Sequence, residues 1–336
     1  MCKIFCLDIG GSFIKLGVSG ADGLAETASI SSPSDYDTFL DRLATLLLSE
    51  GIGPQDRLGI SIAGSIDAEN GSVHAAQLPF LASVNLAADL EAAIGTRMGA
   101  ALKESIRVEN DADCFALAEA TFGAGRSYEN VFAIILGTGV GGAQVYRGDL
   151  VRGFGGSAGE WGHGPFIQKQ DPSAPGFVPQ FACACGQKGC INTVGGARGL
   201  EAMHAASGNP LSESKTIIDG WAGGDAACTA TVSSYVSLLS DALAITLNIT
   251  GAQIVPVGGG LSNALILLSA IDSEVQRKVL LPRPTPLVVK GQTGHNGGLW
   301  GIYAQLMKEM SAIERNQPRG LRRQSPVASN SGRRRC

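Results

Sequence analysis

Residues 7–18 read LDIGGSFIKLGV, and residues 134–145 read IILGTGVGGAQV. Each stretch is an apolar, β-prone segment followed by a glycine-rich turn and a second segment of the same kind. A device that occurs twice in one chain indicates a duplicated structural unit. The sequence therefore predicts an α/β fold made of two similar halves, with a cleft between them.

The segments around both turns alternate between strand and helix patterns. In the first half, strands are expected at 3–9, 13–18, 26–30, 58–63 and 105–108, and a helix at 35–48. In the second half, strands are expected at 131–136, 143–146, 252–257 and 286–289, and helices at 111–121, 197–206, 213–222, 226–248, 263–275 and 298–310. Residues 153–196 are rich in Gly, Pro and Cys with little periodicity, so this long irregular stretch needs a stabilising feature of its own.

The composition is that of a globular protein. Hydrophobic residues make up 44% of the 336 residues and charged residues 17%, which is enough apolar material for two domains with cores. The first residues contain no apolar run long enough for a secretory signal, and no stretch of eighteen uninterrupted apolar residues follows. We therefore expect a cytoplasmic protein without a membrane partner.

The charge is unevenly distributed along the chain. The formal net charge is −4, yet the last 22 residues hold seven arginines and no acid, so the rest of the chain carries about −11. An acidic body argues against nucleic acid as the main partner. We expect the tail, residues 315–336, to be disordered because it lacks apolar periodicity.

Glycine-rich turns suit the binding of phosphate, because several backbone N–H groups can point inward where no side chain blocks the approach. The candidate phosphate and nucleotide contacts are Asp8, Gly10, Gly11, Ser12, Lys15, Gly137, Thr138, Gly139, Gly258, Gly259 and Gly260. A carboxylate beside phosphate suggests a bridging Mg²⁺. Neither a P-loop nor a Rossmann signature is present at these positions, and each turn alone could be an ordinary hairpin. Three such turns together favour a nucleotide-binding site. The third turn, at 258–260, is expected to open a helix whose N-terminus lies against the base and ribose.

Val108-Glu109-Asn110-Asp111 lies where a buried strand is expected to end and a helix to begin. Polar side chains at such a junction commonly contact ligands. Asp111 could also be a plain N-cap, and a helix N-terminus would keep its pKa low. A weak base is still compatible with phosphoryl transfer, since the nucleophile loses its proton late.

Three cysteines lie within eight residues, at Cys183, Cys185 and Cys190, downstream of His163 in the segment GEWGH. Three thiolates and one imidazole form a tetrahedral ligand set that leaves no open position for an activated water. The pattern predicts a structural zinc site, which would also hold Glu160 and His163 rigidly enough to bind sugar hydroxyls.

These motifs together resemble the ROK family of bacterial sugar kinases and related repressors, from about residue 6 to residue 306. The resemblance implies a two-lobed actin-like, hexokinase-like (ribonuclease H-like) fold with an interlobe cleft. The first lobe would comprise residues 1–112 plus about 298–312, and the second residues 113–297 with the zinc loop. It also implies Mg-ATP as phosphoryl donor, one structural Zn²⁺ and a homodimer.

Within the family, the segments DADCFALAEA and LGTGVGGA are most similar to bacterial N-acetylglucosamine kinases. The resemblance implies that Asp111 accepts the proton of the sugar 6-hydroxyl, which attacks the γ-phosphate of ATP. The residues expected to contact the sugar are Gly64, Asn110, Asp111, Glu160, His163 and Asn192. N-acetylmannosamine and glucose are the alternative substrates.

One departure concerns the position two residues after Cys190. The family usually has Glu there, in contact with the anomeric end of the sugar, whereas this chain has Asn192. An amide loses the charge that strengthens such a hydrogen bond, a difference of about 1 kcal/mol. A non-catalytic sugar sensor is therefore one alternative. A transcriptional repressor is another, although the first glycine turn begins too early to leave room for a helix-turn-helix module.

Overall fold

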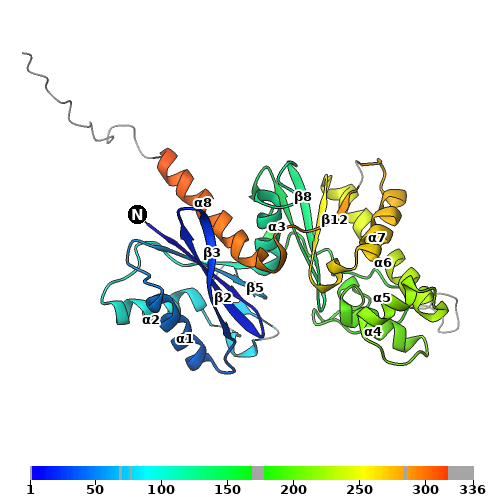
Figure 1. Cartoon of the computed structure of the whole chain (residues 1–336), viewed down its shortest axis with the longest axis horizontal. Helices are drawn as coiled ribbons and strands as arrows, with labels where there is room; N and C mark the ends of the chain where they lie inside the picture. The colour runs from blue at the N-terminus through cyan, green and yellow to red at the C-terminus, as the bar shows by residue number, and fades with distance from the viewer. Residues whose placement is uncertain are drawn as a thin grey trace, which may run out of the picture.

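The computed structural model describes residues 2–67, 70–75, 78–82, 84–168, 178–283 and 286–316. These residues form two lobes, each built around a five-stranded sheet. In Figure 1 the first lobe runs from blue to cyan and the second from green to yellow, with helices α3 and α8 lying between the sheets. The duplicated α/β architecture predicted from the two glycine turns is therefore confirmed.

The two sheets have the same topology. The first has the order β3-β2-β1-β4-β7, and its strands are Gly23–Ser31, Phe13–Gly20, Ile4–Ile9, Arg57–Ile62 and Arg107–Asn110. The second has the order β10-β9-β8-β11-β12, and its strands are Asp149–Leu150, Val140–Tyr146, Asn130–Leu136, Val255–Gly258 and Val288–Lys290. In both sheets the first three strands of this order pair antiparallel and the last three pair parallel.

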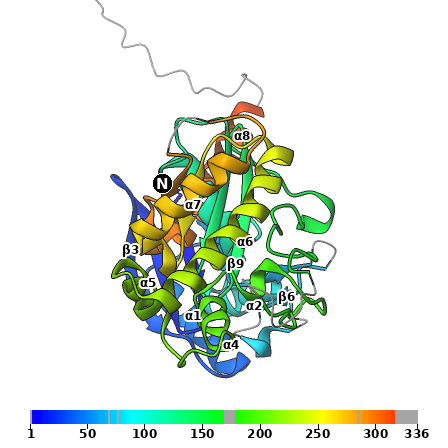
Figure 2. The same cartoon turned by 90° about the vertical axis from the view of Figure 1, so that its right-hand side faces the viewer.

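Helices cover both faces of each sheet. They are α1 Tyr36–Ser49, α2 Leu86–Met98, α3 Asp111–Thr121, α4 Ala197–Ala206, α5 Ser214–Ala222, α6 Ala226–Thr250, α7 Leu265–Lys278 and α8 Gly297–Asn316. A small third sheet pairs β5 Ser65–Ile66 with β6 Val73–His74. Figure 2 shows α6 and α7 lying across one face of the second sheet. Helix α6 is long and apolar enough to cross a membrane. However, 56% of its apolar 18-residue stretch is buried inside the structure, as in a core helix.

Strand alternation explains why β1 is buried on both faces. Phe5, Leu7 and Ile9 pack into the core with α1 and α2. Ile4 and Cys6 point the other way and pack against α8. Asp8 lies on the same face of β1 as Ile4 and Cys6, so its carboxylate faces the start of α8. In β8, the corresponding strand of the second lobe, Ile135 occupies the position of Asp8 in the aligned motifs.

Helices α3 and α8 cross in close contact between the lobes. A Cβ atom added at Gly301 of α8 would overlap the backbone carbonyl of Cys114 in α3. Cys114 itself is fully buried together with Leu299 and Ile302. Glycine thus lets two helix backbones approach to a distance that any side chain would prevent.

Two details differ from the sequence-based expectations, and one expectation concerns residues that are mostly not described. Helix α2 was not predicted, although Asn85 and Gly99 cap its ends and Leu86, Leu90 and Ile94 are buried at helical spacing. The glycines at 258–260 do not open a helix directly, because a 3₁₀ turn at Gly260–Asn263 precedes α7. The predicted basic tail lies almost entirely outside the described residues, since its residues 317–336 are not described.

Candidate active site

A cavity of about 410 Å³ lies between the lobes. Its walls come from the β1–β2 hairpin, the N-terminus of α3, the ends of β8 and β11, and the start of α8. The lining residues are Asp8, Ile9, Gly10, Gly11, Ser12, Phe13, Lys15, Ala63, Asp111, Phe115, Ile135, Gly258, Gly259, Gly294, His295, Gly297 and Gly298. A second cavity of about 510 Å³ shares part of this wall and extends to Gly260, Ser262, Asn263 and Lys290.

The first glycine turn and Asp111 therefore lie at one cavity, as expected. The hairpin is closed by a hydrogen bond of 3.0 Å from the Gly10 N–H to the Phe13 carbonyl. The Lys15 ammonium donates to the His295 carbonyl and to Asn296 Oδ1, at 2.9 Å each. Lys15 thus ties the hairpin to the segment that leads into α8, besides contributing positive charge to the cavity wall.

Asp8 is held in an unusual environment for a carboxylate. Ser61 Oγ donates to Asp8 Oδ1 at 2.9 Å. Burial raises the pKa of Asp8, although the Ser61 hydroxyl and the Lys15 charge act in the opposite direction. A Cβ atom at Gly298 would overlap this carboxylate, so the glycine at the start of α8 leaves space for it. A carboxylate and a hydroxyl are the hard oxygen donors that Mg²⁺ prefers.

The junction of β7 and α3 presents Asn110 and Asp111 together. Asn110 is the N-cap, and its Oδ1 accepts from the Ala112 N–H at 2.8 Å and from the Asp113 N–H at 3.3 Å. Its Nδ2 donates to the Gly64 carbonyl at 2.8 Å, which brings two predicted sugar contacts side by side. The N-cap interpretation of Asp111 is therefore wrong, because the preceding asparagine fills that role.

The pKa of Asp111 also differs from the sequence-based expectation. Burial, and next the charge of Asp8, raise the pKa of Asp111 to about 6, with a smaller contribution from Glu160. Hydrogen bonds from the start of α3 lower the pKa but do not outweigh these effects. The prediction of a low pKa at the helix N-terminus is thus wrong, because desolvation and neighbouring carboxylates outweigh the helix terminus.

The second glycine turn lies beside the cysteine segment. Gly137, Thr138 and Gly139 line neither of the two cavities described above. The Gly137 carbonyl accepts from the Ala197 N–H at 2.8 Å. Gly259 approaches this turn so closely that a Cβ atom there would overlap the end of β8. The second turn therefore supports the wall of the site, and its contribution to ligand contacts stays a prediction.

The His163 and cysteine side chains converge as the sequence predicted. The four ligand atoms of His163, Cys183, Cys185 and Cys190 all lie within 4.8 Å of one another. Cys185 Sγ and Cys190 Sγ are 3.7 Å apart, and Cys183 Sγ is 3.6 Å from His163 Nδ1. A tetrahedral zinc with Zn–S bonds of about 2.3 Å and Zn–N bonds of about 2.05 Å requires edges of about 3.8 and 3.6 Å. The cluster therefore fits a zinc ion.

Glu160 and His163 are neighbours at the edge of this cluster. His163 Nε2 lies 3.6 Å from Glu160 Oε2, on the opposite side of the ring from Nδ1. The carboxylate is thus placed where it can orient the imidazole, as a carboxylate does for a metal-bound histidine. Both side chains retain exposed surface, 62% for Glu160 and 30% for His163. Both are therefore accessible from solvent, although neither lines the two cavities described above.

Asn192 links the cysteine cluster to the second glycine turn. Its Oδ1 accepts from the Val140 N–H at 3.0 Å, and its Nδ2 faces Cys183 Sγ at 3.8 Å. Both ends of the amide therefore have partners within the protein. A contact between Asn192 and a sugar would have to compete with these partners or add to them.

The sequence interpretation missed part of the site. Phe115 of α3 and the segment 294–298 line the first cavity. Glu119, which is fully buried, accepts at Oε1 from the N–H and the hydroxyl of Thr293, at 2.7 and 2.6 Å. It thereby fixes the backbone just before that segment. The available signal was the run GQTGHNGG at 291–298, a further glycine-rich stretch before a helix.

Comparisons with known proteins agree with this architecture. The family profile described as "ROK family" matches residues 4–309. The N-acetyl-D-glucosamine kinase of Escherichia fergusonii is 33% identical over 299 residues, covering 88% of this chain and 96% of that protein. The ROK hexokinase of Thermus thermophilus superposes with a TM-score of 0.74 at 24% identity, covering 92% of this chain and 99% of that chain. The ROK family glucokinase of Streptomyces griseus, solved with glucose and AMPPNP, gives 0.68 at 26% identity, covering 91% and 99%.

Proposed function

The chain belongs to the ROK family, and from this premise we propose that it is an ATP-dependent sugar kinase. We propose further that it phosphorylates the 6-hydroxyl of a hexose, with N-acetylglucosamine as the preferred substrate. The observation that carries this proposal is a buried carboxylate, Asp111, at a cavity whose other walls include the first glycine turn and the glycines at 258–259 and 294–298. The identity to N-acetyl-D-glucosamine kinases supports the choice of sugar.

In this proposal the phosphates of the nucleotide occupy the first cavity, and its base and ribose occupy the second cavity, which shares part of the same wall. The phosphates lie against the hairpin backbone, where the N–H groups of Gly11 and Ser12 can donate to phosphate oxygens while the Gly10 N–H stays bonded to the Phe13 carbonyl. The base and ribose occupy the larger cavity beside Gly260 and Lys290. Asp8 would hold the Mg²⁺ that neutralises phosphate charge, and the burial of this carboxylate strengthens its attraction for a cation.

The sugar lies on the other side of Asp111. Asn110 supplies an amide and the Gly64 backbone supplies a carbonyl beside Asp111, the candidate catalytic base. The two groups are already in contact with each other. Glu160 and His163 supply a carboxylate and an imidazole that can hydrogen-bond adjacent hydroxyls. Asp111 accepts the proton of the attacking hydroxyl, and its raised pKa makes it a better base near neutral pH than an ordinary aspartate.

The zinc in this proposal is structural. His163 Nδ1 and the three cysteine thiolates would hold it, and the ion would fix the segment that carries Glu160. Since protein ligands fill all four positions, the ion takes no part in the transfer itself.

A coupled assay of ADP release tests the function. We expect ADP release that requires both Mg²⁺ and sugar, highest with N-acetylglucosamine and lower with N-acetylmannosamine and glucose. Asp111→Ala should reduce kcat by at least 10²-fold. Asp35→Asn is a matched control, because Asp35 is also an aspartate at a helix start but lies outside both cavities. Full turnover in Asp111→Ala would refute the assigned role.

A non-catalytic sugar sensor is the second candidate, and Asn192 is the observation that favours it. Its amide is occupied by Val140 and Cys183 rather than free in the cleft. Calorimetry with N-acetylglucosamine separates the two functions. Tight sugar binding without sugar-dependent ADP release would support the sensor.

A further inference from the structure

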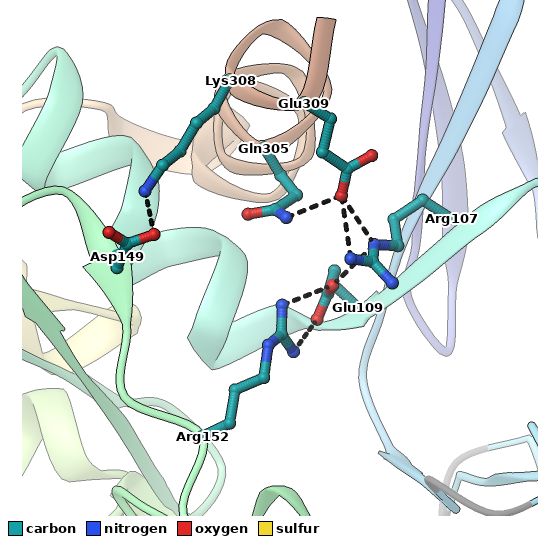
Figure 3. Close-up of polar contacts among 7 residues, drawn as sticks. All are labelled: Arg107, Glu109, Asp149, Arg152, Gln305, Lys308 and Glu309. Atoms are coloured by element: carbon teal, nitrogen blue, oxygen red, sulfur yellow. Dashed lines mark hydrogen bonds and ion pairs between the residues drawn. The ribbon is translucent and has the colours of Figure 1, made fainter. Parts of the chain in front are cut away.

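A cluster of polar contacts joins the two lobes beside the candidate active site (Figure 3). Its members are Arg107 and Glu109 of β7, Asp149 of β10, Arg152, and Gln305, Lys308 and Glu309 of α8. Glu109 is at the centre, with a side chain only 4% exposed, whereas the Arg152 side chain is 43% exposed. The function proposed above uses none of these residues.

The contact between Glu109 and Arg152 is bidentate. Arg152 Nη1 donates to Glu109 Oε2 and Nη2 donates to Oε1, at 2.8 Å each. Arg107 Nε lies 3.2 Å from the same Oε1 and connects Glu109 to Glu309 of α8. The carboxylate is therefore held by one arginine from its own lobe and one from the other lobe. A parallel pair of hydrogen bonds fixes orientation as well as separation.

The two residues are close in sequence to both sides of the proposed site. Glu109 directly precedes Asn110 and Asp111 at the end of β7. Arg152 begins the glycine-rich segment 152–159, and Glu160 follows this segment directly. This segment contains three glycines at positive φ before Gly159, and a hydrogen bond of 3.0 Å from the Ala158 N–H to the Arg152 carbonyl closes it on its first residue. The ion pair ties the first residue of this segment to β7, the strand that directly precedes the candidate base.

We propose that the Glu109–Arg152 pair is a positioning pair, which sets the spacing between Asp111 and the sugar-binding segment at Glu160. The inference rests on the proposed kinase function. Neither side chain reaches the reacting atoms; they act by fixing the two backbone segments that do. A displacement of about 1 Å between reacting groups can slow a reaction by about 10²-fold, so such a pair affects turnover without touching substrate.

A purely structural role makes a different prediction. Removing Arg152 leaves a buried carboxylate with one cation in place of two, which destabilises the fold whatever the pair does for catalysis. The double variant Glu109→Gln/Arg152→Ala removes that uncompensated charge. If the pair serves only charge balance, the double variant recovers both stability and kinetics. If it positions the site, stability recovers and kinetics do not.

The experiment compares steady-state kinetics and melting temperature across four variants. In Arg152→Ala we expect the sugar KM to rise about tenfold and kcat to fall about tenfold, with the ATP KM within about twofold of wild type. Arg152→Lys keeps the positive charge but cannot form the bidentate pair of hydrogen bonds. Its kinetic constants should therefore lie between those of the wild type and those of Arg152→Ala. The double variant should regain the melting temperature and keep the kinetic defect. Arg97→Ala is the matched control, because Arg97 is similarly exposed, at 37%, and pairs with Asp41 within one lobe.

Hydrogen exchange of the ligand-free protein gives a readout without turnover. The amides of 151–160 should exchange faster in Arg152→Ala and in the double variant, but not in Arg97→Ala. An active wild type with an unchanged sugar KM in Arg152→Ala, or with restored kinetics in the double variant, would overturn the positioning role alone. A wild type that releases no ADP with any of the three sugars would overturn the proposed function, and the positioning role with it.

Discussion

Asp111 is the residue at which the proposed function and the stability of the fold oppose each other. Its pKa is raised from 3.8 to about 6, first by burial and second by the charge of Asp8. The folded chain therefore disfavours the ionised form that a base requires. Such a group destabilises the native state above pH 6, and this destabilisation is relieved as pH falls through about 6.

Asp111→Asn should accordingly stabilise the protein while abolishing ADP release. The amide keeps the side-chain volume and removes the buried charge, so we expect a gain of about 2 kcal/mol at pH 7.5. The gain should shrink between pH 6 and pH 4, because the wild-type carboxyl then becomes protonated in the folded state. Thermal unfolding of the variant and the wild type at pH 7.5 and at pH 4 measures this difference. A less stable variant at pH 7.5 would contradict the burial of a charged Asp111.

The same pKa predicts the acid limb of the activity profile. If Asp111 is the base, kcat/KM for the sugar should fall about tenfold per pH unit below about pH 6. The measurement is initial rate at low sugar concentration from pH 5 to 8, with the coupling enzymes checked at each pH. A profile that stays flat down to pH 5 would mean that another group accepts the proton or that Asp8 is neutralised by a bound cation.

At the scale of elements, the segment 153–196 illustrates how a region with little regular structure can be fixed. In its described part, Ile191–Thr193 forms a short 3₁₀ turn, and Phe154–Gly156 forms a tight turn in which Gly155 has a positive φ. The cysteine and histidine side chains converge within it. A metal that binds only the folded arrangement contributes its binding free energy to folding.

We therefore expect about one zinc per chain by elemental analysis and loss of this zinc in Cys185→Ser. Cys185 is exposed, so the substitution removes a ligand with little loss of packing. Its melting temperature and its sugar affinity should both fall. Cys228→Ser is the control, since Cys228 lies outside the cluster and should retain zinc. Zinc retained at wild-type level in Cys185→Ser would show that the fourth ligand is another residue.

The elements predicted from sequence agree with the structure where the local pattern is strong. The helices at 111–121 and 197–206 match α3 and α4 to the residue, and both begin at a recognisable change from strand or turn. Helix α2 was missed because its sequence is rich in alanine and contains Gly95, so its apolar stripe is narrow. The turn after Gly259 was misjudged because a 3₁₀ turn and a helix start look alike in sequence.

For the whole molecule, the crossing of α3 and α8 decides how the lobes are joined. Gly301→Ala should destabilise the protein by about 1–3 kcal/mol, because the added methyl group has no space against the Cys114 carbonyl. Gly95→Ala in α2 is the matched control. The added methyl group makes only ordinary van der Waals contacts. The substitution should therefore stabilise the protein by about 0.5–1 kcal/mol, as alanine does in a helix interior. Denaturant unfolding of both variants measures the difference, and a neutral Gly301→Ala would mean that the lobes can shift apart at little cost.

Features that depend on residues close together in the chain could be predicted from the sequence. The two glycine turns indicated the duplicated fold, and the spacing of Cys183, Cys185 and Cys190 indicated a cluster that the structure brings together with His163. Tertiary structure alone decided the pKa of Asp111 and the pairing of Glu109 with Arg152. Each of these depends on groups from separate segments, whose distances and shared burial arise only when the lobes are folded together. Electrostatic interactions are set by those distances and by solvent access, and sequence spacing encodes neither.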